Sequence, residues 1–322
     1  MKRLIGVIVA FATALCVATT AQAQSYPNRP IRLVVGFPPG GAADIIARLY
    51  AQALSVQLGQ PVVIENKPGT GGNLASDIVA KAEPDGYTLL HGTENVFISN
   101  PHVYSRMPFD PFKDLVPVAS LVSNQIVLAV NPVVPANTLT EFVELARRTK
   151  PPLFYASIGN GSQHHLAMEM LKQHVNIDLT HVPYRGGGPA AIALLGGEVS
   201  AMFGGGSVVP IIRSGKLRGL ASTGPVRNPA TPDLPTIGEV YPGYEALSWH
   251  AVFVPAGTPQ PIIERLQKEI AVVLKQPEFA ARLASTGSGE PYSATPQELT
   301  ARMKRDYEKY GKLIRSIGIK VE

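Results

Sequence analysis

The sequence predicts an α/β protein in which mainly parallel sheets are flanked by helices. Short apolar, β-branched segments recur along the chain, segments with apolar residues at helical spacing lie between them, and glycine- and proline-rich turns join the two kinds. The composition agrees, because 45% hydrophobic and 16% charged residues exclude a disordered polyelectrolyte and a charge-rich coiled coil. The 322 residues are enough for two domains.

Residues 1–23 are predicted to be a secretory signal peptide. Lys2-Arg3 forms its basic region, an apolar stretch spans residues 4–18, and Ala21-Gln22-Ala23 matches the pattern at which signal peptidase cleaves. The apolar stretch is shorter than the roughly 20 residues of a membrane-spanning helix. Cys16 is the only cysteine, so the mature chain is expected to have no disulfide bond, thiol nucleophile or cysteine metal ligand. These features predict a soluble protein exported to the periplasm.

The first predicted unit of the mature chain is a strand, a rigid turn and a helix. Residues 31–35 are apolar and β-branched, and the turn Gly36-Phe37-Pro38-Pro39-Gly40-Gly41 follows them. After the turn, apolar residues recur at helical spacing at Ile46, Leu49, Ala53 and Val56. This order predicts a helix that begins directly beyond the carboxyl end of a strand.

The same alternation continues along the chain. Further strands are predicted at residues 62–64, 87–90, 126–130, 153–156, 180–182, 199–203 and 217–222, and helices at residues 74–80, 139–149, 162–174, 188–195 and 207–214. Two helix starts carry a capping pattern, Thr138 with Glu141 and Thr295 with Glu298. The last helix is expected to dock on the core through Leu299, Met303, Tyr307, Tyr310 and Ile314.

Motifs of enzymes, metal sites and nucleic-acid binding are weak. The chain contains no Gly-x-Ser-x-Gly, no Gly-x-x-x-x-Gly-Lys-Ser/Thr and no strict Gly-x-Gly-x-x-Gly. His164-His165 and Glu169 share one side of a predicted helix, but no third ligand follows at a telling spacing. The net charge of +5 falls to +3 without the signal peptide, and the basic residues are scattered. No catalytic residue, metal, cofactor or nucleic-acid partner is therefore predicted.

Glycine-rich turns lie directly before predicted helices. They are Gly40-Gly41, Gly69-Thr70-Gly71-Gly72, Gly159-Asn160-Gly161-Ser162 and Gly186-Gly187-Gly188. Helix N-termini present unpaired N–H donors and a partial positive charge, and glycine lets the backbone come close to an anion. Ligands of open α/β sheets bind beyond the carboxyl ends of the strands. Together the turns favour binding of a carboxylate over catalysis, and a purely structural use of each glycine is the alternative.

Ordered motifs run along nearly the whole predicted mature chain. They are Tyr26-Pro27-Asn28-Arg29-Pro30-Ile31, Gly36-Phe37-Pro38-Pro39-Gly40-Gly41-Ala42-Ala43-Asp44, Gly59-Gln60-Pro61-Val62-Val63, Glu65-Asn66-Lys67-Pro68-Gly69, Pro84-Asp85-Gly86-Tyr87-Thr88-Leu89, Tyr155-Ala156-Ser157 with Gly161-Ser162 and His165-Leu166, Val182-Pro183-Tyr184-Arg185-Gly186, Ser214-Gly215-Lys216-Leu217-Arg218 and Pro255-Ala256-Gly257-Thr258-Pro259. In this order and spacing they resemble the Bug family, the periplasmic substrate-binding receptors of tripartite tricarboxylate transporters.

The resemblance implies a two-lobe periplasmic-binding-protein fold of the type II kind, with the ligand cleft between the lobes. The first lobe is expected to comprise residues 24–125 and 251–322, and the second residues 126–250. The ligand is expected to be a small organic carboxylate that the two lobes close upon, and a membrane transporter would recognise the closed form. The chain is expected to be monomeric, and some relatives without a transporter imply an orphan carboxylate sensor as an alternative.

The resemblance also implies ligand-binding residues. Carried onto this sequence, it selects Phe37, Pro39, Gly41, Asp44, Ser157, Gly161 and Ser162, with Tyr184 and Thr93 nearby. The glycine turns and adjoining segments add Gly40, Gly72, Asn95, Gly159, His165 and Gly204 as candidates. His165 fits a residue that pins the turn as well as it fits a ligand contact.

The chain departs from the family pattern at two places. Gly204 follows Met202-Phe203 where many relatives carry an acid, and a buried ligand ammonium without a partner is costly, so an amino-acid ligand is disfavoured. Residues 93–97 differ from the expected Gly- and Ser/Thr-rich run, and Phe97 is either a core residue or an apolar wall of the cleft. Trp249 is expected to pack the crossing between the lobes or to flank the cleft.

Two rival functions remain at this point. One is an exported α/β hydrolase that uses Ser162 with His165, completed by Asp44 or Asp77. The other is a structural or adhesive envelope protein, which would bind no ligand and would not close.

Overall fold

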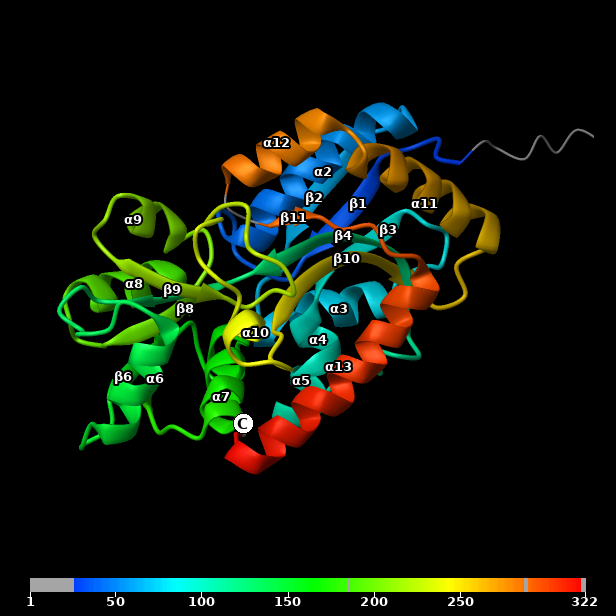
Figure 1. Ribbon diagram of the computed structural model, residues 1–322. Helices are drawn as coiled ribbons and strands as arrows, with labels where there is room; N and C mark the ends of the chain where they lie inside the picture. Colours follow the sequence, from blue (N-terminus) through cyan, green and yellow to red (C-terminus); the bar gives the residue numbers. More distant parts are fainter. Residues whose placement is uncertain (1–25, 185, 287–288, 320–322) are drawn as a thin grey trace, which may run out of the picture.

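The computed structural model describes residues 26–184, 186–286 and 289–319, so the predicted signal peptide lies outside the described residues. The described chain forms two α/β lobes, each built on one sheet (Figure 1). The first sheet has the strand order β11-β4-β10-β3-β1-β2 and the second the order β7-β6-β8-β5-β9. The predicted two-lobe α/β fold is confirmed.

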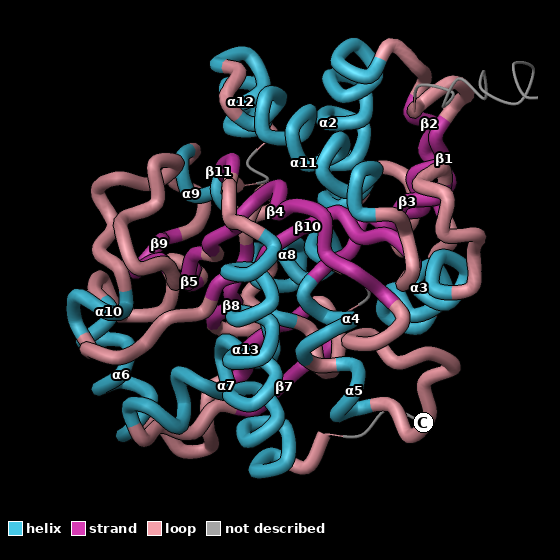
Figure 2. Tube along the Cα trace, turned by 90° about the vertical axis from the view of Figure 1, so that its right-hand side faces the viewer, coloured by secondary structure: helices cyan, strands magenta, loops and turns pink. Residues whose placement is uncertain are grey.

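The first sheet is covered by helices on both faces. Its strands are β1 (Ile31–Val35), β2 (Val62–Asn66), β3 (Thr88–Thr93), β4 (Leu115–Gln125), β10 (Leu247–Pro255) and β11 (Glu290–Pro291). Its helical elements are α2 (Ala42–Leu58), η1 (Thr70–Gly72), α3 (Asn73–Ala80), α4 (Glu94–Ile98), α5 (Asn100–Val103), α11 (Gln260–Leu274), α12 (Pro277–Ser285) and α13 (Pro296–Ile317). Figure 2 shows α2, α11 and α12 on one side of β4 and β10, and α3, α4 and α5 on the other.

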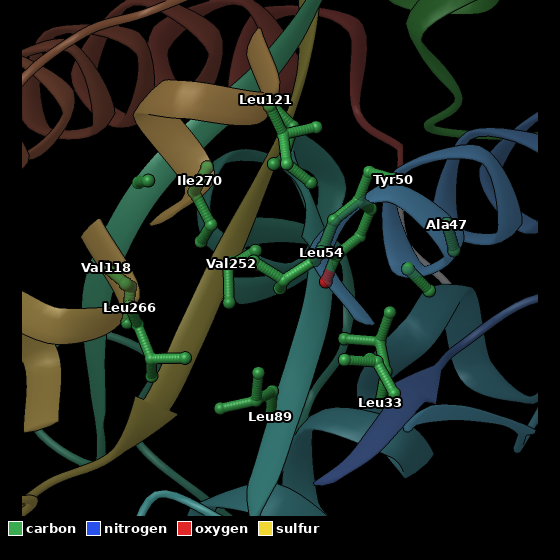
Figure 3. Close-up of a cluster of buried hydrophobic side chains, with 14 of the residues drawn as sticks. Leu33, Ala47, Tyr50, Leu54, Leu89, Val118, Leu121, Val252, Leu266 and Ile270 are labelled. Carbon is green, nitrogen blue, oxygen red and sulfur yellow. The ribbon is translucent and has the colours of Figure 1, made fainter. Parts of the chain in front are cut away.

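Successive side chains of the strand β1 pack into two separate hydrophobic cores, one on each face of the sheet. Leu33 points into the core below α2, α11 and α12, where Tyr50 and Leu266 are also buried (Figure 3). The neighbouring Val34 lies in the core below α3, α4 and α13. Burial on both faces explains why these strands are almost continuously apolar rather than alternating.

The second sheet follows the same plan. Its strands are β5 (Val127–Val130), β6 (Phe154–Ser157), β7 (Thr180–Pro183), β8 (Ala201–Gly204) and β9 (Arg218–Ser222). Its helices are α6 (Leu139–Arg148), α7 (Gln163–Val175), α8 (Gly187–Leu195), α9 (Val209–Arg213) and α10 (Ile237–Val240). One core lies against α6, α7 and α10, and a smaller one against α8 and α9.

Both sheets are mixed, which corrects the expectation of mainly parallel sheets. β1 runs parallel to β2 and β3, and β6 runs parallel to β7 and β8. β10 is antiparallel to β3 and β4, and β5 is antiparallel to β8 and β9. β5 is the first strand after the chain enters the second lobe, and β10 is the first strand after it returns to the first lobe. Each runs opposite to neighbouring strands of its sheet.

The chain passes from the first sheet to the second at Ile126, the single residue between β4 and β5. It returns between the end of β9 at Ser222 and the start of β10 at Leu247. Residues 247–250, which the predicted boundary assigned to the second lobe, pair in the first sheet as the beginning of β10.

The predicted helix starts agree with the structure, and one predicted helix face does not. Thr138 accepts a hydrogen bond from the Glu141 amide, and Thr295 forms a full capping box with Glu298. On α2, however, Val56 is 77% exposed, and the buried face runs through Tyr50 and Leu54. The buried row follows the i, i+4 spacing from Ile46, so Val56 falls on the solvent side.

Candidate ligand-binding site

Two of the predicted ligand residues, Thr93 and Gly204, end strands beside the crossing between the two sheets. Thr93 ends β3 and pairs in register with His250 of β10, whose first residue Leu247 pairs with Gln125 at the end of β4. Across Ile126, Val127 pairs with Gly204 at the end of β8. The carboxyl ends of β3 and β8 therefore both lie beside the crossing, and the loops that follow them border the space between the lobes.

Asp44 organises the turn that follows β1. Its Oδ2 accepts hydrogen bonds from the Gly40 amide at 2.9 Å and from Arg48 Nε at 2.8 Å, and its Oδ1 accepts one from Asn66 Nδ2 at 2.8 Å. Asn66 also donates to the Phe37 carbonyl at 3.0 Å. Burial alone would raise the pKa of Asp44, but these hydrogen bonds outweigh it and lower the pKa. The carboxylate is thus ionised and committed to holding the turn.

Gly72 joins this turn to the start of α3. A Cβ on Gly36 would lie 2.7 Å from the Gly72 Cα, so the two backbones touch and neither position has room for a side chain. Gly72 also has φ +94° and lies against Phe37 and Val96. Its role is to bring the turn after β1, the N-terminus of α3 and helix α4 together.

Thr93 and Asn95 lie at the junction of β3 and α4. The Thr93 side chain is 5% exposed, and its hydroxyl is buried without a hydrogen-bond partner among the described residues. Leaving such a group unpaired is costly, which makes the Thr93 hydroxyl a candidate partner for a ligand or a water molecule. Asn95 is half-buried and lines a small cavity between α4 and α7 together with Gln163, whose Nε2 is also unpaired.

Glu94 is a buried carboxylate at this junction that was not selected from the sequence. Its Oε2 accepts hydrogen bonds from Ser248 Oγ at 3.0 Å and from the Trp249 amide at 3.3 Å. Burial raises the pKa of Glu94 to about 7, although these bonds and the charge of Arg302 act in the opposite direction. The one signal in the sequence is an acid placed directly after an apolar strand.

The turn after β6 is held by its own serines. Ser157 Oγ lies 3.1 Å from both the amide and the carbonyl of Gly159, and Ser162 Oγ donates to the Gly159 carbonyl at 2.7 Å. Ser162 caps α7 by accepting from the His165 amide at 3.4 Å. Gly159 and Gly161 have φ of +129° and +71°, which only glycine adopts easily. The sequence therefore builds a tight loop at the N-terminus of α7.

His165 pins this turn from below, together with His181, which sequence reasoning missed. His165 Nδ1 accepts a hydrogen bond from the Gly161 amide at 3.1 Å, and the His165 and His181 rings stack at 3.8 Å. His181 Nε2 lies 2.6 Å from Ser157 Oγ. Burial lowers the pKa of His165 to about 3 and also lowers that of His181, so the stack is neutral. Of the two roles open for His165, the observed contact is the one that holds the turn.

The side chains of Ser162 and His165 are not hydrogen-bonded to each other in this structure. The Ser162 hydroxyl bonds to backbone groups of Gly159 and His165, while the His165 ring nitrogen bonds to Gly161. A general base must reach the proton it removes, and this arrangement directs the imidazole elsewhere. Asp44 is taken by Gly40, Arg48 and Asn66, so it does not complete a triad.

Tyr184 and Gly204 follow the neighbouring strands of the second lobe. The Tyr184 amide donates to the Ser157 carbonyl at 3.0 Å, which joins the two loops, and its hydroxyl lies 3.5 Å from Glu198. A Cβ on Gly204 would collide with Val208, so glycine is required there by packing. Pro39 and Gly41 lie on the exposed part of the turn after β1.

The lobes touch where the turn of α7 meets α5. A Cβ on Gly161 would lie 3.6 Å from Val103 of the first lobe. Farther along α7, Leu166 belongs to the core beneath α13, and Gln173 Nε2 donates to Ser316 Oγ at 2.7 Å. Figure 1 shows α13 reaching α7 along the lower edge of the molecule. The second-lobe turn is thereby fixed against the first lobe.

Phe97 and Trp249 are core residues. Both are fully buried, and the Phe97 ring lies 4.3 Å from Phe253 and 5.9 Å from Trp249. Phe97 therefore supports β10 from within the first lobe. Trp249 packs beside the crossing between the lobes, which is the first of its two predicted alternatives.

Metal-ligating clusters and membrane-spanning helices bear on the class of site. Within residues 26–184, 186–286 and 289–319, no three His, Cys, Asp or Glu side chains are grouped so that they could hold a metal ion. None of the helices in that part of the chain is long and apolar enough to cross a membrane.

Known proteins resemble this chain over nearly its whole length. Residues 46–319 match the family model described as the tripartite tricarboxylate transporter family receptor. The protein BugT of Bordetella pertussis is 35% identical over 327 residues, covering 100% of this chain and 99% of that protein. Rpa4515 of R. palustris with adipate is 34% identical, with a TM-score of 0.82 over 92% of this chain and 99% of that one.

Two more solved structures agree. The periplasmic binding protein BugD is 32% identical with a TM-score of 0.78, covering 92% of this chain and 100% of its own. MatC from Rhodopseudomonas palustris with bound malate is 31% identical with a TM-score of 0.74, covering 90% and 100%. With the fold, the strand-end loops and these matches in agreement, the chain belongs to the tripartite tricarboxylate transporter receptor family, in which the Bug proteins are found.

Proposed function

We propose that this protein is a periplasmic receptor that captures a small carboxylate between its lobes and delivers it to a tripartite tricarboxylate-type membrane transporter. The observation that carries the proposal is the set of loops at the facing strand ends. They offer glycine turns before α2, α3 and α7 and the unpaired Thr93 hydroxyl. Helix N-termini and hydroxyl donors suit a carboxylate.

The ligand is a carboxylate without an ammonium group. Adipate and malate in the structures of two relatives support a dicarboxylate. In this chain, Asp44 is committed to its own turn, and Gly204 stands where an acid would pair with an amine. Glu94 is the remaining buried acid at the junction, and its raised pKa makes it a weak partner for a cation.

The receptor works by closing, and no bond is made or broken. A carboxylate that contacts loops of both lobes binds the closed form more tightly, so it shifts the population toward closure. The closed surface is what the transporter recognises. The Ser162 and His165 contacts support binding over hydrolysis, because both side chains hold backbone rather than a substrate.

The working form is the exported, mature chain. We place cleavage of the signal peptide after Ala23 and the action of the protein as a monomer in the periplasm. We divide the described chain into a first lobe of residues 26–125 and 247–319 and a second lobe of residues 126–246, following the strand pairing of β4, β5 and β10.

The first experiment is native mass spectrometry of the mature protein as purified, followed by a thermal-shift panel of dicarboxylates, tricarboxylates, aromatic carboxylates and amino acids. A ligand that binds the folded state raises the melting temperature. We expect a carboxylate, recovered chemically unchanged, to co-purify or to stabilise. Stabilisation by amino acids alone, or turnover of the bound acid, would contradict the proposal.

A matched pair of variants localises the effect. Thr93→Val removes the unpaired hydroxyl at the end of β3, and Thr231→Val removes another buried, unpaired hydroxyl in the segment between β9 and β10. A hydrogen bond to a charged group contributes about 1.5–3 kcal/mol, so Thr93→Val should weaken carboxylate binding about tenfold or more. Thr231→Val should leave the affinity unchanged. Equal affinities for the two variants would remove Thr93 from the site.

A further inference from the structure

A cavity lies beside the crossing between the lobes, and none of the predicted ligand residues lines it. Its volume is about 300 Å³, at the lower end of small-molecule sites, which span roughly 300–1,000 Å³. The first lobe contributes Gln125, Tyr292 and Arg302 to its wall, and the second contributes Val209 and Ala230. We call it the hinge cavity. Most of its lining is apolar, with a few polar groups among the side chains.

Arg302 brings a buried positive charge to this wall. Its side chain is 11% exposed, its Nε donates to Asp306 Oδ2 over a long 3.4 Å, and its guanidinium carbon lies 5.4 Å from the centre of the Tyr292 ring. Both partners belong to the first lobe. A guanidinium has five N–H donors in a planar fork that suits a carboxylate. Donor capacity therefore remains for an anion in the cavity.

The other charged residues of the wall offset each other. Arg213 and Glu290 are both exposed, and the Arg213 guanidinium already donates to the Ala230 carbonyl at 2.8 Å. Their opposite charges leave Arg302, which is ion-paired with Asp306 behind the wall, as the remaining charged group of the lining. A buried cation in a mostly apolar wall is matched by a ligand with one anionic end and an apolar body.

Gln125 contributes a second polar group to the wall, and its side-chain oxygen lacks a hydrogen-bond partner in the described chain. Its Oε1 is buried and makes no hydrogen bond among the described residues. The amide packs against Gly224, where any Cβ would collide with it, so the side chain is held in place. The buried end of the amide therefore carries a polar atom that lacks a hydrogen-bond partner within the described part of the chain.

The hinge cavity shares the loop after β8 with the proposed carboxylate site, through Gly205 and Val209, but it lies away from the turn after β1. The first sheet places β11 at one edge and β1 with β2 at the other. Three strand spacings, roughly 14 Å at about 4.8 Å each, separate β4 with Gln125 from β1 with the Phe37 turn. A single small acid held by that turn does not reach the cavity.

We propose that the hinge cavity is a second binding site, one for a small organic anion with an apolar body, such as an aromatic carboxylate, which Arg302 holds. Because the wall comes from both lobes, an occupant contacts both sides of the crossing. It favours the lobe arrangement in which these contacts are made, so it changes the affinity of the strand-end loops for their carboxylate, and that carboxylate changes the affinity of the cavity by the same factor.

The test is a ¹⁹F NMR titration of the mature protein with 4-fluorobenzoate as the probe. We expect saturable binding to the wild type and at least about tenfold weaker binding to Arg302→Met, because the charge-assisted hydrogen bond is lost. The matched control is Arg305→Met, an exposed arginine on the same helix, which should bind as the wild type does. Ala230→Trp fills the cavity from a loop of the second lobe and should abolish binding. Melting curves check that each variant is folded.

A further variant separates this site from the proposed function. Ser157→Ala alters the glycine turn before α7 and leaves the cavity wall unchanged. Probe binding that Ser157→Ala abolishes while Arg302→Met and Ala230→Trp do not would place the probe between the strand-end loops and overturn the proposal. Absence of saturable binding to the wild type would also overturn it. Neither result affects the native mass spectrum by which the carboxylate function is judged.

Discussion

At the scale of single residues, the side chains of the candidate site mainly hold backbone in place. Asp44 binds the Gly40 amide, His165 binds the Gly161 amide, and Ser162 binds the Gly159 carbonyl. Since their polar atoms are used internally, the groups left for a ligand are amides at helix N-termini and the hydroxyl of Thr93. Such a site would bind a carboxylate through uncharged N–H and O–H donors rather than through ionised side chains.

Asp44 should contribute more to the free energy of unfolding than the half-buried Asp77 of the same lobe. Asp44→Ala removes three hydrogen bonds and is expected to lower the free energy of unfolding by about 1–3 kcal/mol and to weaken ligand binding. Asp77→Ala, which loses an ion pair with Lys81 near the surface, should cost less than about 1 kcal/mol. Urea unfolding at pH 7 measures both.

The effect of Asp44 should also depend on pH in a defined direction. Its pKa is lower in the folded protein than the ordinary value of 3.8, so its contribution is present above pH 3.8 and is lost as the pH falls through the folded value. The stability difference between the wild type and Asp44→Ala should therefore shrink below about pH 4. A difference that grows in acid would contradict the assignment.

The stacked histidines predict acid sensitivity at higher pH. The pKa of His165 is about 3 in the folded chain against 6.5 ordinarily, so the unfolded chain takes up protons first and stability falls as the pH drops below 6.5. His165→Leu should reduce this dependence between pH 6.5 and 4, whereas the exposed His174→Gln should not. Melting temperatures across that range provide the comparison.

Sequence reasoning found the loops but not all of their supports. The motif residues from Phe37 to Asp44 and from Ser157 to His165 were identified through their resemblance to family motifs, each of which is contiguous in the sequence. His181 and Glu94 were missed, since each bonds to a residue that is distant in the chain, His181 to Ser157 and Glu94 to Ser248. Only strand pairing brings His181 of β7 beside Tyr155 of β6, and β10 beside α4.

At the scale of elements, the close approach of two loops depends on glycines. Gly36→Ala is expected to destabilise the protein by about 2 kcal/mol or more and to impair ligand binding, because the new methyl group would meet backbone at Gly72. Gly188→Ala, on α8 with nothing within 4 Å of the new atom, should be neutral or stabilising by about 0.5–1 kcal/mol. Chemical denaturation of the two variants tests the contrast, and equal losses would refute the backbone contact.

The junction of α4 and β10 yields another prediction. The pKa of Glu94 is raised to about 7 from 4.5, so burying this acid costs stability once the pH rises above 4.5, and the full cost is reached above pH 7. Glu94→Gln keeps an acceptor for Ser248 and Trp249 and should therefore be more stable than the wild type at pH 8 and gain less at pH 5. Unfolding at the two pH values decides, and a larger gain in acid would contradict the burial of the charge.

Element prediction succeeded where periodicity and caps are local. The helix starts at Thr138 and Thr295 follow from a threonine and a glutamate three residues apart. Neither β4 nor β10 was among the predicted strands. Both are central strands in a sheet whose other strands are far away in sequence, so the pairing that makes them strands, and their antiparallel direction, has no local signal.

At the scale of the whole molecule, the lobes are joined by narrow connections and by the contact of α7 with α13. One residue, Ile126, separates β4 from β5, while Leu166 inserts into the core of the other lobe. The mature protein should therefore change shape by rotation about the crossing rather than by local unfolding.

Small-angle X-ray scattering can measure this rotation. Protein freed of ligand by unfolding and refolding should have a larger radius of gyration than protein saturated with its co-purified carboxylate, because the ligand favours closure. Gly161→Ala, at the contact with Val103, should raise the ligand concentration needed for compaction. An identical radius of gyration with and without the ligand would contradict closure as the working motion.

The interrupted first sheet has a consequence for the order in which the chain matures. The second sheet uses strands between residues 127 and 222 only, whereas the first waits for β10 and β11, which begin at residues 247 and 290. In a chain that emerges amino end first, the second lobe is thus complete while the first sheet has only β1, β2 and β3 paired with one another and lacks β10, which joins them to β4. The first lobe therefore stays open to chaperones and proteases until its last elements are synthesised. Packing of the carboxyl-terminal α13 onto this lobe then completes its core.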